Sequence, residues 1–194
     1  MNELFYYLTY YGTTVLKLLV LFLIFKFIFG ATFKNYHSSW NTLIDGFKYS
    51  TKEFYDLLAE ELKSNGIENI RTSTVSLKEG NALSSKRLYL RVEWRDFQYD
   101  ICGAPFGNGF FISWWLLYKN SLGQILTSKI PFVGAWLVSK LYPETYYKID
   151  TASMFMSYAQ ASVLKVVDKI TNEKGVRALS ETERKPILKD IFKR

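Results

Sequence analysis

The sequence contains one cysteine, Cys102, and one histidine, His37, in 194 residues. A single cysteine excludes an intrachain disulfide and a thiolate metal cluster, and it is typical of a protein in a reducing compartment. A single histidine excludes the paired imidazoles of many metal sites. No local motif supplies an acid to orient His37, so we expect an interfacial or solvated side chain there instead of a catalytic base. We therefore predict no catalytic residue, no cofactor and no metal centre.

Internal repeats and low-complexity tracts are also absent. The composition is 48% hydrophobic and 18% aromatic, which favours a packed core over disorder. The formal net charge is +7, which favours an anionic partner such as a bilayer of anionic lipids. We expect no nucleic-acid partner, because no recognised motif places the basic residues for one.

The N-terminal part of the chain contains a long apolar run from Thr13 to Phe33, with two lysines and no acid. A bilayer core requires about 20 such residues in one helix. Lys17 and Lys26 lie on opposite sides of the midpoint of the run, so each ammonium group is able to reach its own headgroup layer. We therefore predict a single-pass transmembrane helix and assign residues 1–33 to a membrane anchor.

Two other interpretations of this run remain, a buried core helix and a cleaved signal peptide. The signal peptide is disfavoured because the first sixteen residues contain no Lys or Arg. Basic residues follow the run at Lys34, Lys48 and Lys52. Because basic loops stay inside, this asymmetry predicts an external N-terminus and a cytoplasmic domain.

Beyond the anchor, the sequence predicts an aromatic connector over 34–49 and an α+β domain over 50–194. Ser50 and Glu53 form a capping box, and Asn65-Gly66 is typical of a helix end, so we expect a helix over 51–64. The sequence then predicts a roughly four-stranded antiparallel sheet: alternation of apolar and polar residues is weak in the first strand and clear in the next two, and the fourth is apolar on both faces, so it is either central or covered on both sides. Its strands are expected within 67–77, 88–94, 97–102 and 110–118.

The C-terminal part of the chain is expected to be helical. Asp150 is a candidate N-cap for a long helix that ends near Lys174, before Gly175. A second capping box, from Ser180 to Glu183, predicts a short terminal helix that Pro186 distorts.

A glycine-rich segment, 103–109, connects the last two predicted strands. Phosphate-binding loops open onto the N-terminus of a helix, whereas this segment enters a strand. We therefore expect a turn there and not a phosphate site.

Residues 122–142 are apolar, but Pro131 and Gly134 interrupt them. The pattern is compatible with an interfacial or re-entrant membrane segment, and equally with a kinked helix packed on the sheet. In the first case the residues in contact with the lipid surface would be Lys129, Trp136 and Lys140.

The polar face of the strand over 88–94 is the main candidate binding surface, with Arg87, Tyr89 and Arg91 in line. Lys185 and Lys189, on the basic face of the terminal helix, form a second candidate. The densest charged cluster of the sequence is Arg91, Glu93, Arg95, Asp96 and Asp100. An ion-paired, solvated face explains this cluster better than a pair of catalytic carboxylates does.

Four stretches resemble those of uncharacterised bacterial membrane-associated proteins with no assigned activity. They are Pro143-Glu-Thr-Tyr-Tyr-Lys-Ile-Asp150, Arg177-Ala-Leu-Ser-Glu181, Arg184-Lys-Pro186 and Ala104-Pro-Phe-Gly-Asn-Gly-Phe-Phe-Ile-Ser-Trp114. The resemblance implies a bacterial protein at the inner (cytoplasmic) membrane, and it supplies no functional residues.

Three classes of function remain. The first is a membrane-anchored, non-enzymatic adaptor or scaffold that presents its α+β domain to a protein partner at the inner membrane face, as a monomer or an oligomer. The second is a membrane-acting effector, a defence or toxin component, whose residues 110–142 enter the bilayer. The third is an enzyme that acts on lipid headgroups, which the missing histidine pair and nucleophile motif make the weakest.

Overall fold

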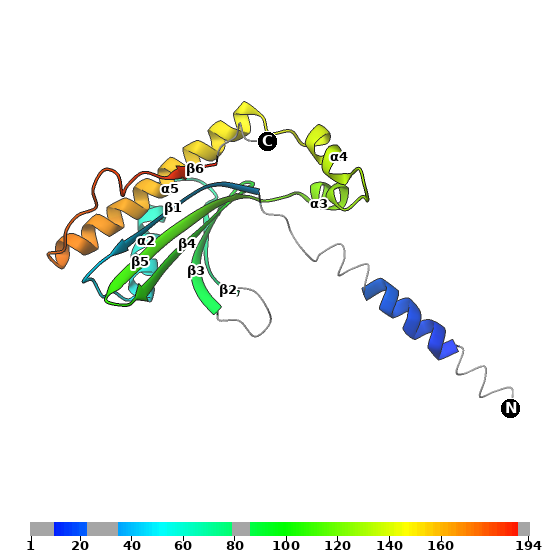
Figure 1. Ribbon diagram of the computed structural model, residues 1–194, viewed down its shortest axis with the longest axis horizontal. Helices are drawn as coiled ribbons and strands as arrows, with labels where there is room; N and C mark the ends of the chain where they lie inside the picture. Colours follow the sequence, from blue (N-terminus) through cyan, green and yellow to red (C-terminus); the bar gives the residue numbers. More distant parts are fainter. Residues whose placement is uncertain (1–9, 23–34, 79–85, 190–194) are drawn as a thin grey trace. The chain divides into compact units, whose positions relative to one another are not determined.

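The computed structural model describes residues 10–22, 35–78 and 86–189 (Figure 1). The chain divides into two compact units. The larger unit comprises Lys34–Lys119 and Glu144–Arg194, and the smaller unit comprises Met1–Phe33 and Asn120–Pro143.

The larger unit is built on a six-stranded sheet with the strand order β2-β3-β4-β5-β1-β6, in which the paired strands are antiparallel. Its strands are β1 (Asn35–Ile44), β2 (Arg71–Lys78), β3 (Lys86–Trp94), β4 (Phe97–Phe106), β5 (Gly109–Tyr118) and β6 (Ile187–Leu188). Short turns join β3 to β4 and β4 to β5, and they contain Arg95 and Gly107 with φ values of 49° and 59°. Of the glycine-rich segment, only Gly107 and Asn108 form the predicted turn, because β4 extends through Pro105 to Phe106 and β5 begins at Gly109.

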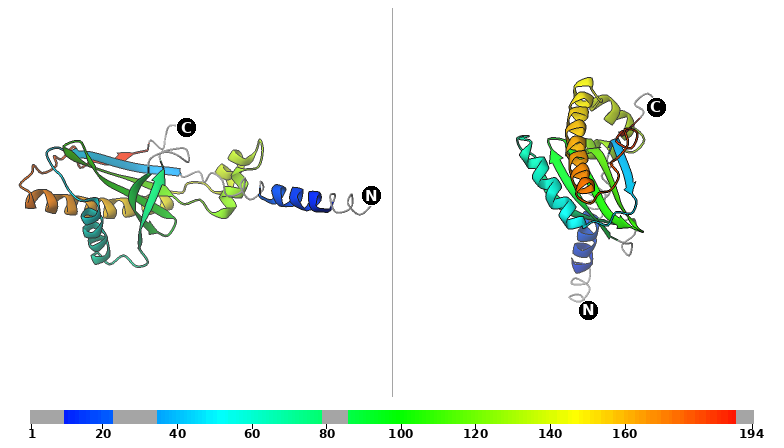
Figure 2. Two further views of the ribbon diagram at one scale, coloured as in Figure 1. Left: turned by 90° about the horizontal axis from the view of Figure 1, so that it is seen from below. Right: turned by 90° about the vertical axis from the view of Figure 1, so that its left-hand side faces the viewer.

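Two helices, α2 (Thr51–Ser64) and α5 (Tyr146–Glu173), lie against the same face of this sheet (Figure 2). The Ser50 side chain accepts a hydrogen bond from the backbone N–H of Glu53 at 3.4 Å, which confirms the predicted helix over 51–64 and its cap. A Cβ at Gly103 of β4 would lie 2.5 Å from the Phe54 ring. Glycine at this position therefore lets α2 approach the sheet.

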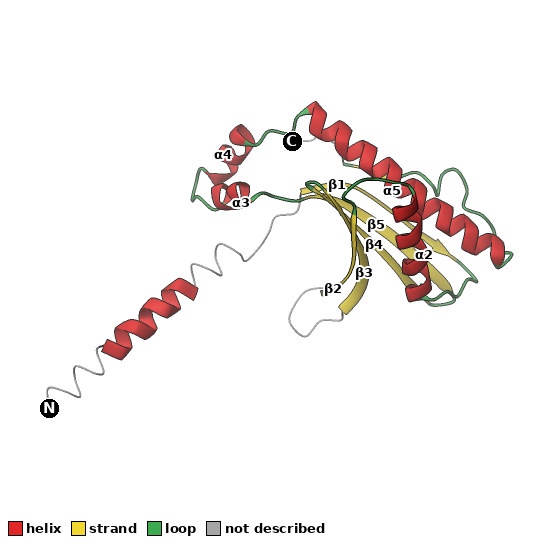
Figure 3. Ribbon diagram, turned by 180° about the vertical axis from the view of Figure 1, so that it is seen from behind, coloured by secondary structure: helices red, strands yellow, loops and turns green. Residues whose placement is uncertain are grey.

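The core of the larger unit lies between the sheet and these two helices. Tyr99 stacks on Trp114 with ring centroids 4.7 Å apart, and Phe155 of α5 meets Tyr99 edge to face at 6.1 Å. Each buried aromatic side chain removes roughly 150–250 Å² from water, so such contacts dominate the packing energy. Figure 3 shows α2 and α5 in front of the sheet, and none of the described helices of this unit packs on the opposite face, which is turned to the viewer in Figure 1.

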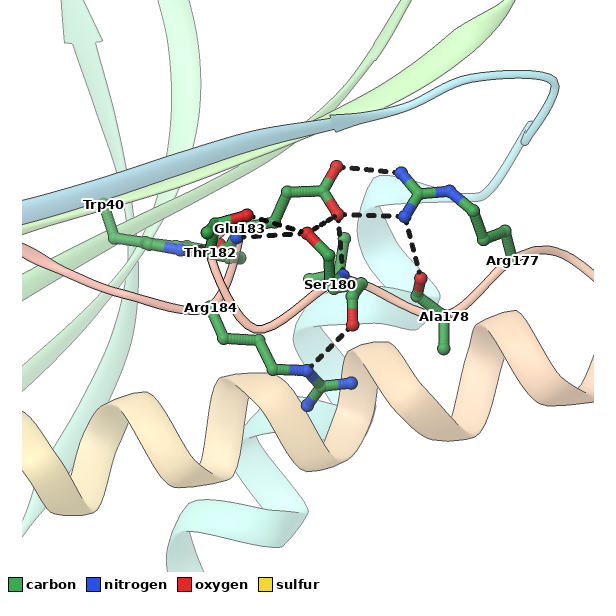
Figure 4. A network of polar contacts seen from close by, with 8 residues as sticks. Trp40, Arg177, Ala178, Ser180, Thr182, Glu183 and Arg184 are labelled. Atoms are coloured by element: carbon green, nitrogen blue, oxygen red, sulfur yellow. Dashed lines mark hydrogen bonds and ion pairs between the residues drawn. The ribbon is translucent and has the colours of Figure 1, made fainter.

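The C-terminal tail runs back along the sheet and is held by a polar network (Figure 4). Arg177 donates two hydrogen bonds to the Glu183 carboxylate, at 3.0 and 2.8 Å. The backbone N–H and the hydroxyl of Ser180 each donate a further hydrogen bond to the same carboxylate. The indole N–H of Trp40 donates to the Glu183 carbonyl at 2.6 Å. Arg184 forms a two-point ion pair with Asp168 of α5. These contacts fix the tail against β1 and α5.

The predicted transmembrane helix is not supported. Residues 10–22 are helical, and at 1.5 Å per residue these described residues span about 20 Å. Within the described ranges, the chain contains no helix that combines the length and the apolar character required to cross a membrane. The single-pass membrane assignment is corrected accordingly. The rest of the predicted span, with Lys26, lies outside the described residues.

The predicted four-stranded sheet is also corrected, because the described sheet has six strands. Residues 35–44, assigned to a connector, form β1 and pair with β5. The Ser180 capping box forms, but it opens only one turn, and Ile187 and Leu188 then pair with β1 as β6. The long helix begins at Tyr146 with Thr145 as its N-cap, and not at Asp150, and it ends at Glu173 before Gly175, whose φ is 64°.

The described part of the smaller unit that follows β5 consists of two short helices, α3 (Leu122–Ser128) and α4 (Gly134–Leu141). Ser121 and Gln124 form a reciprocal capping box at the start of α3. A Cβ at Gly134 would lie 2.6 Å from the Ser128 carbonyl oxygen, so glycine permits the close turn between the helices. The interruption at Pro131 and Gly134 therefore separates two helices.

Candidate functional site: the open face of the sheet

The face of the sheet opposite α2 and α5 is called the open face here. Its side chains form four cross-strand rows, because antiparallel partners point to the same side. From the β4–β5 turn onward, the rows are Leu43, Phe111 and Ala104; Asn41, Ser113 and Cys102; Ser39, Trp115, Asp100 and Arg91; and Tyr36, Leu117, Gln98 and Glu93. Arg87 and Tyr89 precede Arg91 on β3 at intervals of two residues, so they lie on the same face of that strand. The face thus changes from apolar at one end to charged at the other.

The charged end is organised by Asp100, whose residue is only 3% exposed although no described helix covers it. Arg91 donates two hydrogen bonds to its carboxylate, at 2.7 and 3.0 Å, and the Gln98 amide donates a third at 2.6 Å. The hydrogen bond to Asp100 raises the pKa of the Arg91 guanidinium. The buried Asp100 carboxylate thus accepts three hydrogen bonds from side chains of the sheet. Because two of them come from the Arg91 guanidinium, that cation is held in one orientation.

A second pair on this face joins Glu93 to Lys119 at 2.5 Å. The Lys119 hydrogen bond is the main cause that lowers the pKa of Glu93. The predicted charged cluster is therefore ion-paired at two of its acids, Glu93 and Asp100. Arg95, in contrast, lies over the ring of Trp94 at 4.6 Å in the turn after β3.

The second of the four rows, which contains Asn41 and Ser113, also contains the buried thiol of Cys102. The residue is 0% exposed, and burial raises the pKa of its thiol, so it is a weak nucleophile. Burial likewise raises the pKa of Tyr89, and the Arg87 guanidinium partly opposes the rise in the pKa of both groups. Arg87, Tyr89 and Arg91 are therefore brought together as predicted, on one face of β3.

Two parts of this face were not predicted from the sequence. Trp115 of β5 lies directly opposite Asp100, is 45% exposed and packs against Tyr36 at 5.6 Å between ring centroids. Leu43 and Phe111 form a register pair at the apolar end. The sequence of β5 is apolar on both faces, and this pattern could have predicted them. Apolar side chains on an uncovered face often mark a binding surface.

The other predicted site residues lie elsewhere. Lys185 and Lys189 are exposed on the tail beside β6, and not on a helix. Lys17 is exposed on the helix over 10–22. In the smaller unit, Lys129 is the C-cap of α3, while Trp136 and Lys140 are exposed on α4.

His37 lies in β1, with Nδ1 3.1 Å from the Ser38 hydroxyl and its ring edge to face with Tyr118. Burial is the main cause that lowers its pKa, opposed by Glu144. The expected solvated imidazole is thus partly buried.

Described residues of the larger unit line at least two cavities. One, of about 460 Å³, lies between α2 and α5, and the ion pair between Lys165 and Glu61 at 2.8 Å lies at its wall. The other, of about 360 Å³, lies at the apolar end of the open face. No group of three or more His, Cys, Asp or Glu side chains in the described part of the chain is placed to hold a metal ion.

Comparison with known proteins gives little further guidance. No family model matches the chain, and no curated protein matches it. Among solved structures, TTHA0849 from Thermus thermophilus is similar with 19% sequence identity, over 70% of this chain and 97% of that one. The TM-score of 0.26 is too low for any conclusion about fold or function to follow from this similarity.

Proposed function

We propose that this chain is a non-enzymatic adaptor whose open face binds a protein partner. The observation that carries the proposal is the combination of Arg91, held rigid by Asp100, with Trp115 exposed in the same row. Arg, Trp and Tyr dominate the energetic centres of protein interfaces, and fixed side chains lose little entropy on binding. A transmembrane anchor forms no part of the proposal.

The open face also has the charge expected for an acidic partner. Asp100 and Glu93 are neutralised by Arg91 and Lys119, respectively, which leaves the Arg87 guanidinium without an ion pair to a carboxylate of the described residues. A partner that approaches this face therefore meets net positive charge beside aromatic rings. Electrostatic complementarity of this kind speeds association and selects partners.

The test is site-specific photo-crosslinking in cells, with a photoreactive amino acid at Trp115 and, as a control, at Lys52 on the outer side of α2. We expect one defined adduct from position 115 and none from position 52. Arg87→Gln should abolish this adduct while the far-UV circular dichroism spectrum stays unchanged. Identical adducts from both positions, or an adduct that survives Arg87→Gln unchanged, would contradict the proposal.

A second candidate function, contact with an anionic lipid surface, is favoured by the α3–α4 segment. Phe132 lies between the two helices with φ 64° and is 106% exposed, and Trp136 is 61% exposed. No acidic residue occurs between Asp100 and Glu144. Exposed aromatic side chains in a basic segment are typical of interfacial lipid binding.

Vesicle sedimentation tests this second function. We expect the chain to pellet with vesicles of phosphatidylglycerol and to remain in solution with phosphatidylcholine. The double substitution Phe132→Ser/Trp136→Ser should abolish pelleting, whereas Trp115→Ser, which removes an exposed tryptophan of the other unit, should not. Loss of pelleting in both variants, or in neither, would contradict a role for this segment.

A further inference from the structure

The cavity at the apolar end of the open face is lined by four strands that are neighbours in the sheet. Its lining consists of Leu43, Arg87, Ala104, Pro105, Phe106 and Phe111, and its volume is about 360 Å³. Leu43 and Ala104 are both register partners of Phe111, so the floor is a single cross-strand row. This volume lies within the roughly 300–1,000 Å³ of small-molecule sites.

The lining combines uncovered apolar side chains with one cation. Phe106 is 67% exposed and Leu43 is 41% exposed, although both belong to strands of the sheet. Arg87 forms no ion pair with a carboxylate of the described residues, since the buried acid of this face, Asp100, is bonded by Arg91 and Gln98. The cavity therefore offers apolar walls and a single guanidinium that lacks a carboxylate partner.

We infer that this cavity binds a small monocarboxylate with an apolar chain, of the size of a medium-chain fatty acid. The guanidinium of Arg87 donates two parallel hydrogen bonds to the carboxylate, the geometry that an arginine fork favours. The hydrocarbon chain of the ligand lies along Leu43, Phe111 and Phe106 and removes their exposed area from water. The cavity lining has one positive charge and no acid, which matches a monoanion better than a dianionic phosphate or a zwitterion.

This inference shares Arg87 with the proposed partner site but does not rest on the adaptor function. A bound carboxylate would neutralise Arg87 and would cover the apolar row next to Tyr89. Ligand binding and partner binding are measured separately, so either is able to fail while the other holds.

The experiment is isothermal titration calorimetry of the full chain with decanoate, decanol and decylammonium, each below its micelle concentration. We expect saturable decanoate binding, at least tenfold weaker decanol binding, and no decylammonium binding. Decanol binding as tight as decanoate, or no decanoate binding at millimolar concentration, would overturn the inference.

Substitutions then locate the site. Arg87→Gln should weaken decanoate binding by about tenfold or more, the effect of losing a charged hydrogen-bonded pair of about 1.4 kcal/mol, and should leave decanol unaffected. Arg95→Gln is the matched control, because it removes the same charge just beyond the opposite end of the same strand. Equal weakening by both variants would show that net charge, and not the cavity, binds the ligand.

A second variant protects the test against misfolding. Phe106→Ser changes an exposed side chain, so the fold should be retained, as circular dichroism will report. It should weaken decanoate and decanol alike. Unchanged decanoate affinity in a folded Phe106→Ser protein would also overturn the inference, whatever the photo-crosslinking from position 115 shows.

Discussion

The two faces of the sheet bury side chains by different means. The covered face is filled by aromatic and aliphatic residues such as Tyr99 and Trp114, which α2 and α5 remove from water. On the open face, Asp100 and Cys102 are 3% and 0% exposed without a described helix above them. The Asp100 carboxylate is bonded by Arg91 of the neighbouring strand and by Gln98 of its own strand. Burial on the first face is thus hydrophobic, and burial on the second is ionic and local.

The difference implies different sensitivities. On the covered face, a substitution lowers stability in proportion to the buried volume that it removes. On the open face, a substitution lowers stability when it leaves one member of an ion pair buried without the other. The same difference leaves the open face available to a partner or ligand, because its charges are already arranged before binding. The following predictions test this contrast.

The largest effect is expected on the covered face. Phe54 is 0% exposed and meets Phe110 edge to face at 5.6 Å between ring centroids. Phe54→Ala should lower the free energy of unfolding by about 3–5 kcal/mol, from lost burial and the cavity that remains. Urea denaturation measures this, with Lys52→Ala on the exposed side of the same helix as the control. A loss below about 1 kcal/mol would mean that α2 does not pack as described.

On the open face, Arg91→Met should cost about 3 kcal/mol, because it leaves Asp100 buried without its cation. The double variant Arg91→Met/Asp100→Leu should recover most of this loss, since no uncompensated charge remains. A double-mutant cycle from urea denaturation gives the coupling. Additive losses in the double variant would show that the pair is solvated and not buried.

A smaller effect of opposite sign is expected from Tyr99. Its hydroxyl is buried and has no hydrogen-bond partner among the described residues. Tyr99→Phe should therefore raise the free energy of unfolding by about 1 kcal/mol. Tyr55→Phe is the matched control and should be destabilising, because the Tyr55 hydroxyl donates to the Leu88 carbonyl and accepts from the Gly103 N–H. Stability changes of equal sign would contradict this distinction.

The smallest effect is a local pH dependence of the tail. The Arg177 hydrogen bonds lower the pKa of Glu183 from its ordinary value of 4.5 to about 2. Because the folded pKa is depressed, the stabilisation is fully present above pH 4.5 and is lost as the pH falls towards 2. Amide hydrogen exchange should show faster exchange of the Ser180 N–H over this window. Glu183→Gln should remove the pH dependence, and an unchanged profile in that variant would assign it to another group.

Much of the larger unit was predictable because its signals are local. The Ser50 cap and the Gly66 stop define α2, and both act within a few residues of the chain. Strands β3 and β4 follow from the alternation of apolar and polar residues in the sequence, and β5 follows from a short apolar run. The alignment of Arg87, Tyr89 and Arg91 follows from the same period of two residues.

Tertiary contacts decided the rest. Strand β1 has the polar residues Ser38 and Thr42 at positions that the fold buries, so its sequence lacks the alternation that would predict a strand. Its pairing with β5 in the sheet makes it a strand. Strand β6 is two residues long and exists through its pairs with Ser38 and Ser39. The apolar run at the N-terminus indicated only that its side chains avoid water. Local composition alone does not determine whether such a run crosses a membrane.

By itself the sequence determined which residues are able to form the helix α2 and the strands β3 to β5, because caps, alternation and short apolar runs act over short distances. Only the tertiary structure decided which strand lies beside which, and therefore that Asp100 meets Arg91 and that Leu43 meets Phe111. These pairs depend on the register between separate strands. Register is set by packing over the whole sheet, and so the open face with its cavity is a property of the fold.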